Sequence, residues 1–307
     1  MINRIPQMKW LDDKTKEYAI KKVVKMTDNI GYPDYIMNPE KLSEDYEGFE
    51  TTPNDYFTNM INFDSFSFGK NLKLFKQQYD NDRWHMTPQT INAYYYLLNN
   101  SMNFPAGIFQ SPFYHSNDPD YLNYGSIGMV IGHELTHAFD NNGKNYDEDG
   151  KFSNWWSDSS LKKFEELSQC FINQYSKFYI TDKYGRKYYV NGKNTLGENL
   201  ADNGGLARAY EAWKISISKD PEHAVERNKA LPGLSDYSYD QLFYISFGQG
   251  WCINATPEYV ISKIENDVHS PAQFRVNGVV SNSEHFAKTF NCQKNAPMNP
   301  NNKCLIW

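Results

Sequence analysis

The sequence predicts a mainly α-helical protein with a small β component, an α+β fold. Several long segments repeat apolar side chains every three to four residues, as amphipathic helices do, whereas only short runs are rich in strand-forming residues. The 307 residues include 40% hydrophobic and 22% charged side chains. This balance is typical of a soluble globular chain with one large domain or two smaller ones.

Helical spacing recurs along most of the chain. The first helical segment ends at Gly31 and Pro33, a typical stop signal. A later one contains Gly204 and Gly205, each of which costs a helix about 1 kcal/mol, so we expect close packing there. The helical segments are residues 11–29, 126–140, 157–178, 196–217, 238–250, 257–267 and 283–291.

Strand signals are few and short. Residues 90–96 are rich in strand formers, and residues 184–192 suggest a hairpin. Residues 104–109 predict a short edge strand, because Pro105 cannot donate a hydrogen bond in a central one. Residues 34–85 are polar, with patchy helical spacing and no chemistry of their own.

The bulk properties exclude some partners. The net charge is -6, and no basic stripe is present, so nucleic acid is a poor partner. No apolar run is long enough for a transmembrane segment, and the first ten residues lack the apolar run of an export signal. Cysteines do not occur as CxxC pairs, which makes a cysteine-based zinc site a poor prediction. The sequons at Asn99 and Asn254 carry little weight alone.

One motif carries chemistry, His133-Glu134-Leu135-Thr136-His137. Residues four apart lie on one face of a helix, so both imidazoles can bind one Zn²⁺. Glu134 lies beside them and can act as general base on a metal-bound water. An ordinary helix with two histidines is the alternative, but a chance match in a chain of this length has odds of about one in a hundred.

A catalytic zinc also needs a third protein ligand. The pattern that supplies a histidine six residues later is excluded, since Asp140 and Gly143 occupy its key positions. Glu198 and Asp202, four apart on a predicted helix, offer a carboxylate ligand and a hydrogen-bond acceptor for a ligand histidine. By itself such a pair usually belongs to the solvent-exposed face of a helix. The upstream histidine motif makes the pair a candidate for completing the zinc site.

Together these residues resemble the neprilysin and endothelin-converting-enzyme family of zinc metallopeptidases. The similarity covers essentially residues 1–307 in the family's order and spacing. The matching segments are Ile91 to Tyr95, Phe104 to Ile108, Gly128 to Asp140, Gly197 to Gly205, Asp267 to Pro271 with Arg275, and Cys304 to Trp307.

The resemblance implies a thermolysin-like catalytic domain over residues 86–307. Residues 1–85 would be a remnant of a second, helical covering domain and the passage into the catalytic domain. It implies one Zn²⁺ bound by His133, His137 and Glu198, with Glu134 as base. Asp202 would then support a zinc-bound histidine.

The resemblance also implies how a peptide substrate is held. His269 corresponds to a histidine that stabilises the transition state, and Arg275 to an arginine that binds a substrate carbonyl. Asn92 and Ala93 lie where a strand edge holds the substrate backbone. The wall of a pocket for a hydrophobic residue after the scissile bond corresponds to Ile108, Phe113, Met129, Val130 and Trp251.

The implied function is hydrolysis of short extracellular peptides on the amino side of hydrophobic residues. Family members are about twice as long, so an alternative is a catalytically impaired fragment that binds zinc and peptides. The family pairs the positions of Cys170 and Cys304, while Cys252 and Cys292 would stay unpaired. The resemblance places the chain outside the cell or in a plasma-membrane ectodomain, although the chain shows no signal or anchor.

Overall fold

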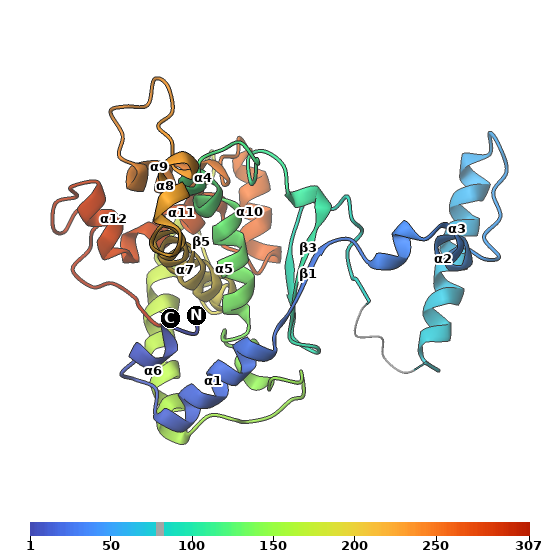
Figure 1. Cartoon of the computed structure of the whole chain (residues 1–307), viewed down its shortest axis with the longest axis horizontal. Coiled ribbons are helices and arrows are strands. Elements are labelled where there is room, and N and C mark those ends of the chain that lie inside the picture. The colour runs from blue at the N-terminus through green and yellow to red at the C-terminus, as the bar shows by residue number, and fades with distance from the viewer. Residues whose placement is uncertain (78–82) are drawn as a thin grey trace.

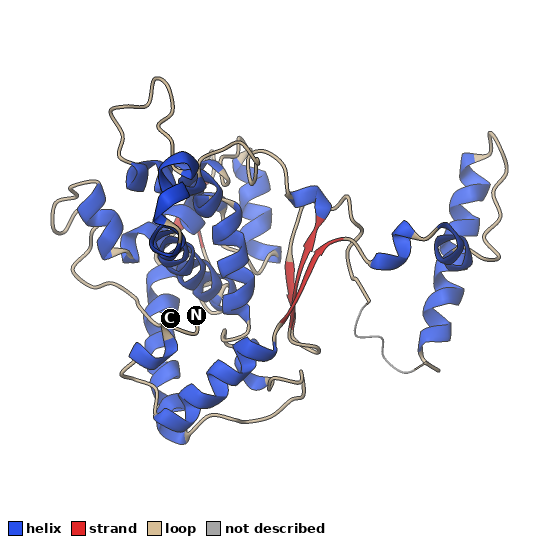
Figure 2. Ribbon diagram, viewed as in Figure 1, coloured by secondary structure: helices blue, strands red, loops and turns tan. Residues whose placement is uncertain are grey.

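The computed structural model describes residues 1–77 and 83–307 of the chain. A helical body carries both termini, and a small sheet lies between this body and the projecting helices α2 and α3 (Figure 1). Helices dominate, as Figure 2 shows, and the strands of the described residues form one three-stranded sheet and one hairpin. The mainly helical α+β prediction is therefore confirmed.

Each predicted helical segment corresponds to a helix, whereas α2, α3, α4, α8 and α11 were not predicted as helices. Many begin at a polar residue that caps them: Asp12 accepts a hydrogen bond from the Thr15 backbone, and Ser238 forms a capping box with Gln241. The α-helices are α1 (Asp13–Lys25), α2 (Pro39–Asp45), α3 (Tyr56–Leu74), α4 (Asp120–Gly125), α5 (Ile127–His137), α6 (Asp158–Tyr175), α7 (Leu196–Lys219), α8 (Pro221–Arg227), α9 (Tyr239–Gln249), α10 (Pro257–Asn266), α11 (Ala272–Asn282) and α12 (Glu284–Thr289).

The sheet corrects two expectations. The segment predicted as a helix to residue 29 ends at Lys25, and β1 (Thr27–Gly31) follows it. The predicted edge strand at 104–109 is instead β3 (Ser101–Pro105), which lies between a parallel β1 and an antiparallel β2 (Tyr94–Tyr96). Pro105 is tolerated because it is the last residue of the strand, where the chain turns into the 3₁₀ helix Ala106–Ile108.

The remaining strands, β4 (Tyr179–Thr181) and β5 (Lys187–Tyr189), pair antiparallel. They form a hairpin, but β4 precedes the predicted segment 184–192, which contains β5 and only the end of the turn, so the predicted bounds are wrong. Among the described residues, no helix is both long and apolar enough to cross a membrane.

The N-terminal and C-terminal segments of the chain pack together in one hydrophobic core. Trp10 packs against Trp156 and Trp307, and its indole N–H donates to the Ile306 carbonyl over 3.0 Å. The disulfide Cys170–Cys304 fixes the C-terminal segment to α6, as the resemblance implied. Residues near the N-terminus, including Ile5 and Leu11, are buried in the same cluster. The division into domains at residue 85 stays a prediction.

Candidate active site

Helix α5 carries the sequence motif and presents both histidines to one point. The two Nε2 atoms of His133 and His137 lie 3.0 Å apart, as expected for residues one helical turn apart. His133 is 6% exposed and Glu134 is 5% exposed, so this end of the helix is shielded from solvent. The motif therefore forms a pair of imidazoles, His133 buried and His137 partly buried, with a buried carboxylate next to them in the chain.

Helix α7 crosses α5 at very short range because both helices have glycine at the contact. A Cβ atom added at Gly132 would lie 2.5 Å from the Gly205 carbonyl oxygen, and one added at Gly205 would lie 2.6 Å from the His133 nitrogen. Gly204 meets the side chain of Thr136 in the same way. The expectation of close packing at these glycines is confirmed, and the close crossing brings the acids of α7 to the histidines of α5.

Glu198 on α7 is the point where the imidazoles converge. Its Oε2 atom lies 3.1 Å from Nε2 of His133, 3.4 Å from Nε2 of His137 and 3.1 Å from Nε2 of His269. This buried oxygen has no hydrogen bond of acceptable geometry among the described residues. His133, His137 and Glu198 can together hold one metal ion. Two imidazole nitrogens and a carboxylate oxygen form a set of three ligands that suits a catalytic Zn²⁺.

The charge of the site also suits a cation. Burial by itself would raise the pKa of Glu198, but its contacts with the three histidines hold that pKa well below its usual range. For His137, burial opposes protonation, yet Asp140 and Glu198 outweigh it and raise the pKa well above the ordinary value. A metal ion bound at the same nitrogens would satisfy these carboxylates in place of protons.

Asp202 lies next to His133, the histidine that it is predicted to support. Its Oδ1 lies 2.8 Å from Nδ1 of His133, although the ring is turned away from ideal hydrogen-bond geometry. Asp202 is fully buried and is paired with Arg275, whose Nε and Nη2 donate to its two oxygens over 2.8 and 2.6 Å. The guanidinium lies 3.8 Å from the centre of the Trp251 ring. This bidentate, stacked arrangement fixes both Asp202 and Arg275.

Asp140 is a site residue that the sequence reading missed. Its Oδ2 lies 2.6 Å from Nδ1 of His137, and its Oδ1 accepts the backbone N–H groups of Asn142 and Gly143, each over 2.7 Å. Each motif histidine thus has its own carboxylate partner. The signal was present in the spacing, because a carboxylate three residues after His137 can return to its ring as the helix ends.

His269 reaches the site from the loop between α10 and α11. Its Nδ1 lies 2.7 Å from Oδ1 of Asp267, which leaves Nε2 directed at Glu198. The loop is held to α7, because the Ser270 hydroxyl donates to Asn199 over 2.8 Å. Half-exposed among buried neighbours, His269 is the imidazole of this group that solvent reaches most easily.

The residues assigned to substrate binding fall into two groups. On the sheet side, Ala93, Ile108, Phe113 and Val130 pack together against β3. Met129 belongs instead to the helical core, where it is 2% exposed, and Trp251 packs against that core. Asn92 is exposed just before β2, an edge strand of its sheet.

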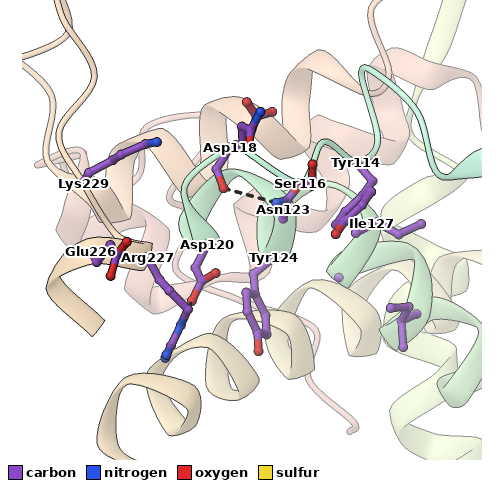
Figure 3. Close-up of a pocket in the computed structure, with 13 residues that line it drawn as sticks. Tyr114, Ser116, Asp118, Asp120, Asn123, Tyr124, Ile127, Glu226, Arg227 and Lys229 are labelled. Atoms are coloured by element: carbon purple, nitrogen blue, oxygen red, sulfur yellow. Dashed lines mark hydrogen bonds and ion pairs between the residues drawn. The ribbon is translucent and has the colours of Figure 1, made fainter. Parts of the chain in front are cut away.

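A separate groove lies over α4 and the start of α5 (Figure 3). It contains none of the residues assigned above. Two of its charged groups pair with each other, since Nε of Arg227 lies 2.9 Å from Oδ2 of Asp120. Because it contains neither motif histidine and not Glu198, we do not assign it the active site. Other residues of the groove include Tyr114, Asp118, Asn123, Tyr124, Ile127 and Lys229.

A His-Glu-x-x-His helix that shares one metal position with a glutamate of a second helix defines a metallopeptidase. The chain belongs to peptidase family M13, whose model matches residues 92–306. It is therefore neprilysin-like by family, and the family implies zinc.

Its relatives are much longer proteins. Neprilysin of Homo sapiens is 43% identical over 307 residues, which are 100% of this chain and 40% of that protein. Neprilysin-3 of Drosophila melanogaster is 45% identical over 303 residues, 99% of this chain and 37% of that protein. A solved structure of Mycobacterium tuberculosis zinc metalloprotease ZMP1 with an inhibitor has a TM-score of 0.85 at 29% identity, covering 100% of this chain and 45% of that one. The chain thus spans less than half the length of these relatives.

Proposed function

We propose that this chain is the catalytic part of a zinc endopeptidase that hydrolyses short extracellular peptides on the amino side of hydrophobic residues. The observation that carries the proposal is the convergence of three imidazole nitrogens on one buried, unsatisfied oxygen of Glu198. An extracellular or ectodomain location is supported by the neprilysin relatives and by the disulfide, since disulfides persist in oxidising compartments.

The metal is held by His133, His137 and Glu198. When bound, zinc supplies a water of lowered pKa and polarises the substrate carbonyl. Asp140 lies 2.6 Å from Nδ1 of His137 and Asp202 lies 2.8 Å from Nδ1 of His133, and both contacts favour the tautomer with Nε2 free as a ligand. Both carboxylates are anchored on their far side, so they hold the rings in a prearranged geometry.

Glu134 is the general base. It follows His133 directly on α5, and it takes the proton of the attacking water and returns it to the leaving amine. His269, held by Asp267, donates from Nε2 to the carbonyl oxygen as it becomes an oxyanion. Such preorganised donors contribute most where water is excluded.

The substrate lies along the edge of the sheet. Strand β2 is an edge strand, so Asn92 and Ala93 at its start can pair with an extended peptide backbone. Arg275 binds a substrate carbonyl with the part of its guanidinium that Asp202 does not use. A hydrophobic side chain after the scissile bond enters a pocket walled by Ile108, Phe113, Met129, Val130 and Trp251.

A quenched short peptide with a hydrophobic residue after the scissile bond tests the proposal. We expect cleavage that a zinc chelator abolishes and added zinc restores. Glu134→Gln should keep the zinc but lower kcat by about 100-fold or more, the contribution of a general base. Zinc binding without cleavage by the wild-type chain would favour the alternative, a zinc- and peptide-binding fragment. Cleavage by Glu134→Gln at the wild-type rate would contradict the role of this residue.

A further inference from the structure

Lys22 on α1 is buried to 1% exposure, which is unusual for a lysine. Its ammonium group donates three hydrogen bonds, to the carbonyl oxygens of Ala138, Gly143 and Tyr146, over 2.8, 2.8 and 2.7 Å. An ammonium group has three donors, so these bonds use all of them. A buried charge is tolerated only with such full pairing.

All three acceptors belong to the segment that follows the zinc-motif helix. Ala138 is the C-terminal cap of α5, where backbone carbonyls lack helical partners and a positive charge is favourable. Gly143 and Tyr146 lie at the two ends of the next turn. The segment 138–146 thus folds around the lysine, with its carbonyls turned inward.

The same segment presents Asp140 to His137. Gly143 connects the two sets of contacts, because its N–H donates to Oδ1 of Asp140 while its carbonyl accepts from Lys22. No other residue fits here without movement, since a Cβ at Gly143 would lie 1.9 Å from the His137 carbonyl oxygen. Moving this backbone would therefore move the carboxylate that orients the His137 ring.

The lysine is itself held in place. Its own carbonyl accepts from the Asn100 side chain, which also donates to the Glu148 carbonyl, over 2.9 and 3.2 Å. On the outer face of α1, Lys25 lies 2.7 Å from Asp149. Helix α1 is thus joined to the segment after the motif at several points, with Lys22 at the buried one.

We propose that Lys22 is a positioning residue of the metal centre: through the backbone of 138–146 it holds Asp140 in contact with His137. The inference rests on the proposed function, since His137 is taken as a zinc ligand. It assigns part of the centre to α1, which precedes the segment that the family model matches.

The test is zinc affinity of the full chain, measured by competition with a chromophoric chelator. Lys22→Met, which keeps the side-chain length without donors, should weaken zinc binding about tenfold or more, as loss of a ligand's hydrogen-bond partner does. Leu11→Ala, a core variant of the same region, should lose stability but keep its zinc affinity within about twofold. Equal affinity in Lys22→Met and wild type would overturn the proposal.

A double-mutant cycle separates positioning from general destabilisation. In an Asp140→Asn background, Lys22→Met should weaken zinc binding little further, because its effect passes through Asp140. The same fold-loss in both backgrounds would contradict this. If Lys22→Met does not fold, Lys22→Gln, which keeps a donor, replaces it in the cycle.

Amide hydrogen exchange of the metal-free protein tests the positioning role of Lys22 without depending on zinc. Exchange should accelerate at Asn142 and Gly143 in the Lys22 variant, because both N–H groups donate to Asp140, and should stay unchanged in α9. Unchanged protection at 142 and 143 would overturn the proposal. A wild-type chain that binds no zinc would instead overturn the proposed function.

Discussion

The α5–α7 crossing differs from the projecting helix α3 in how its residues are buried. At the crossing, glycines let two helices touch backbone to backbone, and buried acids and histidines fill the space beyond. Helix α3 has no buried residue in the described structure, and Phe57 and Phe68 are 75% and 67% exposed. The residues of the α5–α7 crossing are therefore buried in contacts with one another, whereas α3 exposes apolar side chains to solvent.

This difference between the α5–α7 crossing and α3 indicates how each region responds to substitution. Near the crossing Asp202 is paired with Arg275 and His137 with Asp140, so losing one partner leaves an uncompensated buried group. On α3, aromatic side chains contact mainly one another and the neighbouring α2 segment, as Phe66 does with Tyr46 and Phe49. A large exposed apolar face is typical of an interaction surface rather than of a folding core. Substitutions in the two regions should therefore have different consequences.

The largest effect is expected from removing the disulfide. The bond between Cys170 and Cys304 closes 134 residues of the chain, and by chain entropy it stabilises the body by about 4 to 5 kcal/mol. The double variant Cys170→Ser, Cys304→Ser should lower the free energy of unfolding measured in urea by this order. A change below about 1 kcal/mol would show that the body does not depend on the bond. Exchange of α3 amides should not change, since the bond lies in the body.

A matched pair of glycine substitutions tests the comparison directly. Gly205→Ala should destabilise the protein by about 1 to 3 kcal/mol and weaken zinc binding, because its Cβ meets the backbone of His133. Gly69→Ala in α3 meets nothing within 4 Å, so it should stabilise α3 by about 0.5 to 1 kcal/mol. Both are measured by urea unfolding and zinc titration. Equal effects of the two substitutions would remove the distinction between the regions.

A smaller, pH-dependent effect is expected at Asp12, where α1 meets α6. Burial of this carboxylate opposes ionisation, but hydrogen bonds from Ser157, Ser160 and Thr15 outweigh it, so the pKa of Asp12 lies below its ordinary value. A depressed pKa in the folded state stabilises the fold above about pH 4 and loses this contribution as the pH falls.

Unfolding of the metal-free protein between about pH 5 and pH 2.5 measures this contribution. Wild type should lose more stability on acidification than Asp12→Asn, which cannot titrate at this position. A steeper loss in the variant would reverse the assigned sign.

The sequence predicted the site better than its surroundings. His133, His137, Glu198 and Asp202 could be inferred because helical spacing is local and each pair lies on one helix. Strand β1 was missed because its mostly exposed residues alternate weakly, and its partner β3 lies more than 70 residues away. Pairing over such distances depends on tertiary contacts that no local pattern encodes.

Asp140 and Lys22 show a second limit. Asp140 was considered only as a departure from another zinc motif, although its position after His137 allows the contact that the structure contains. Lys22 lies in a helix rich in lysines, where a lysine side chain is ordinarily expected to be exposed to solvent. Its burial depends on carbonyls more than 110 residues away, so it could be recognised only in three dimensions.

The most direct test of the metal centre is the zinc content of the purified chain after dialysis against metal-free buffer. The account predicts one zinc per wild-type chain and none in His137→Ala or Glu198→Ala, with both variants still folded by circular dichroism. Zinc retained at the wild-type ratio by either folded variant, or no zinc in the wild type, would contradict the assignment of His133, His137 and Glu198 as its ligands.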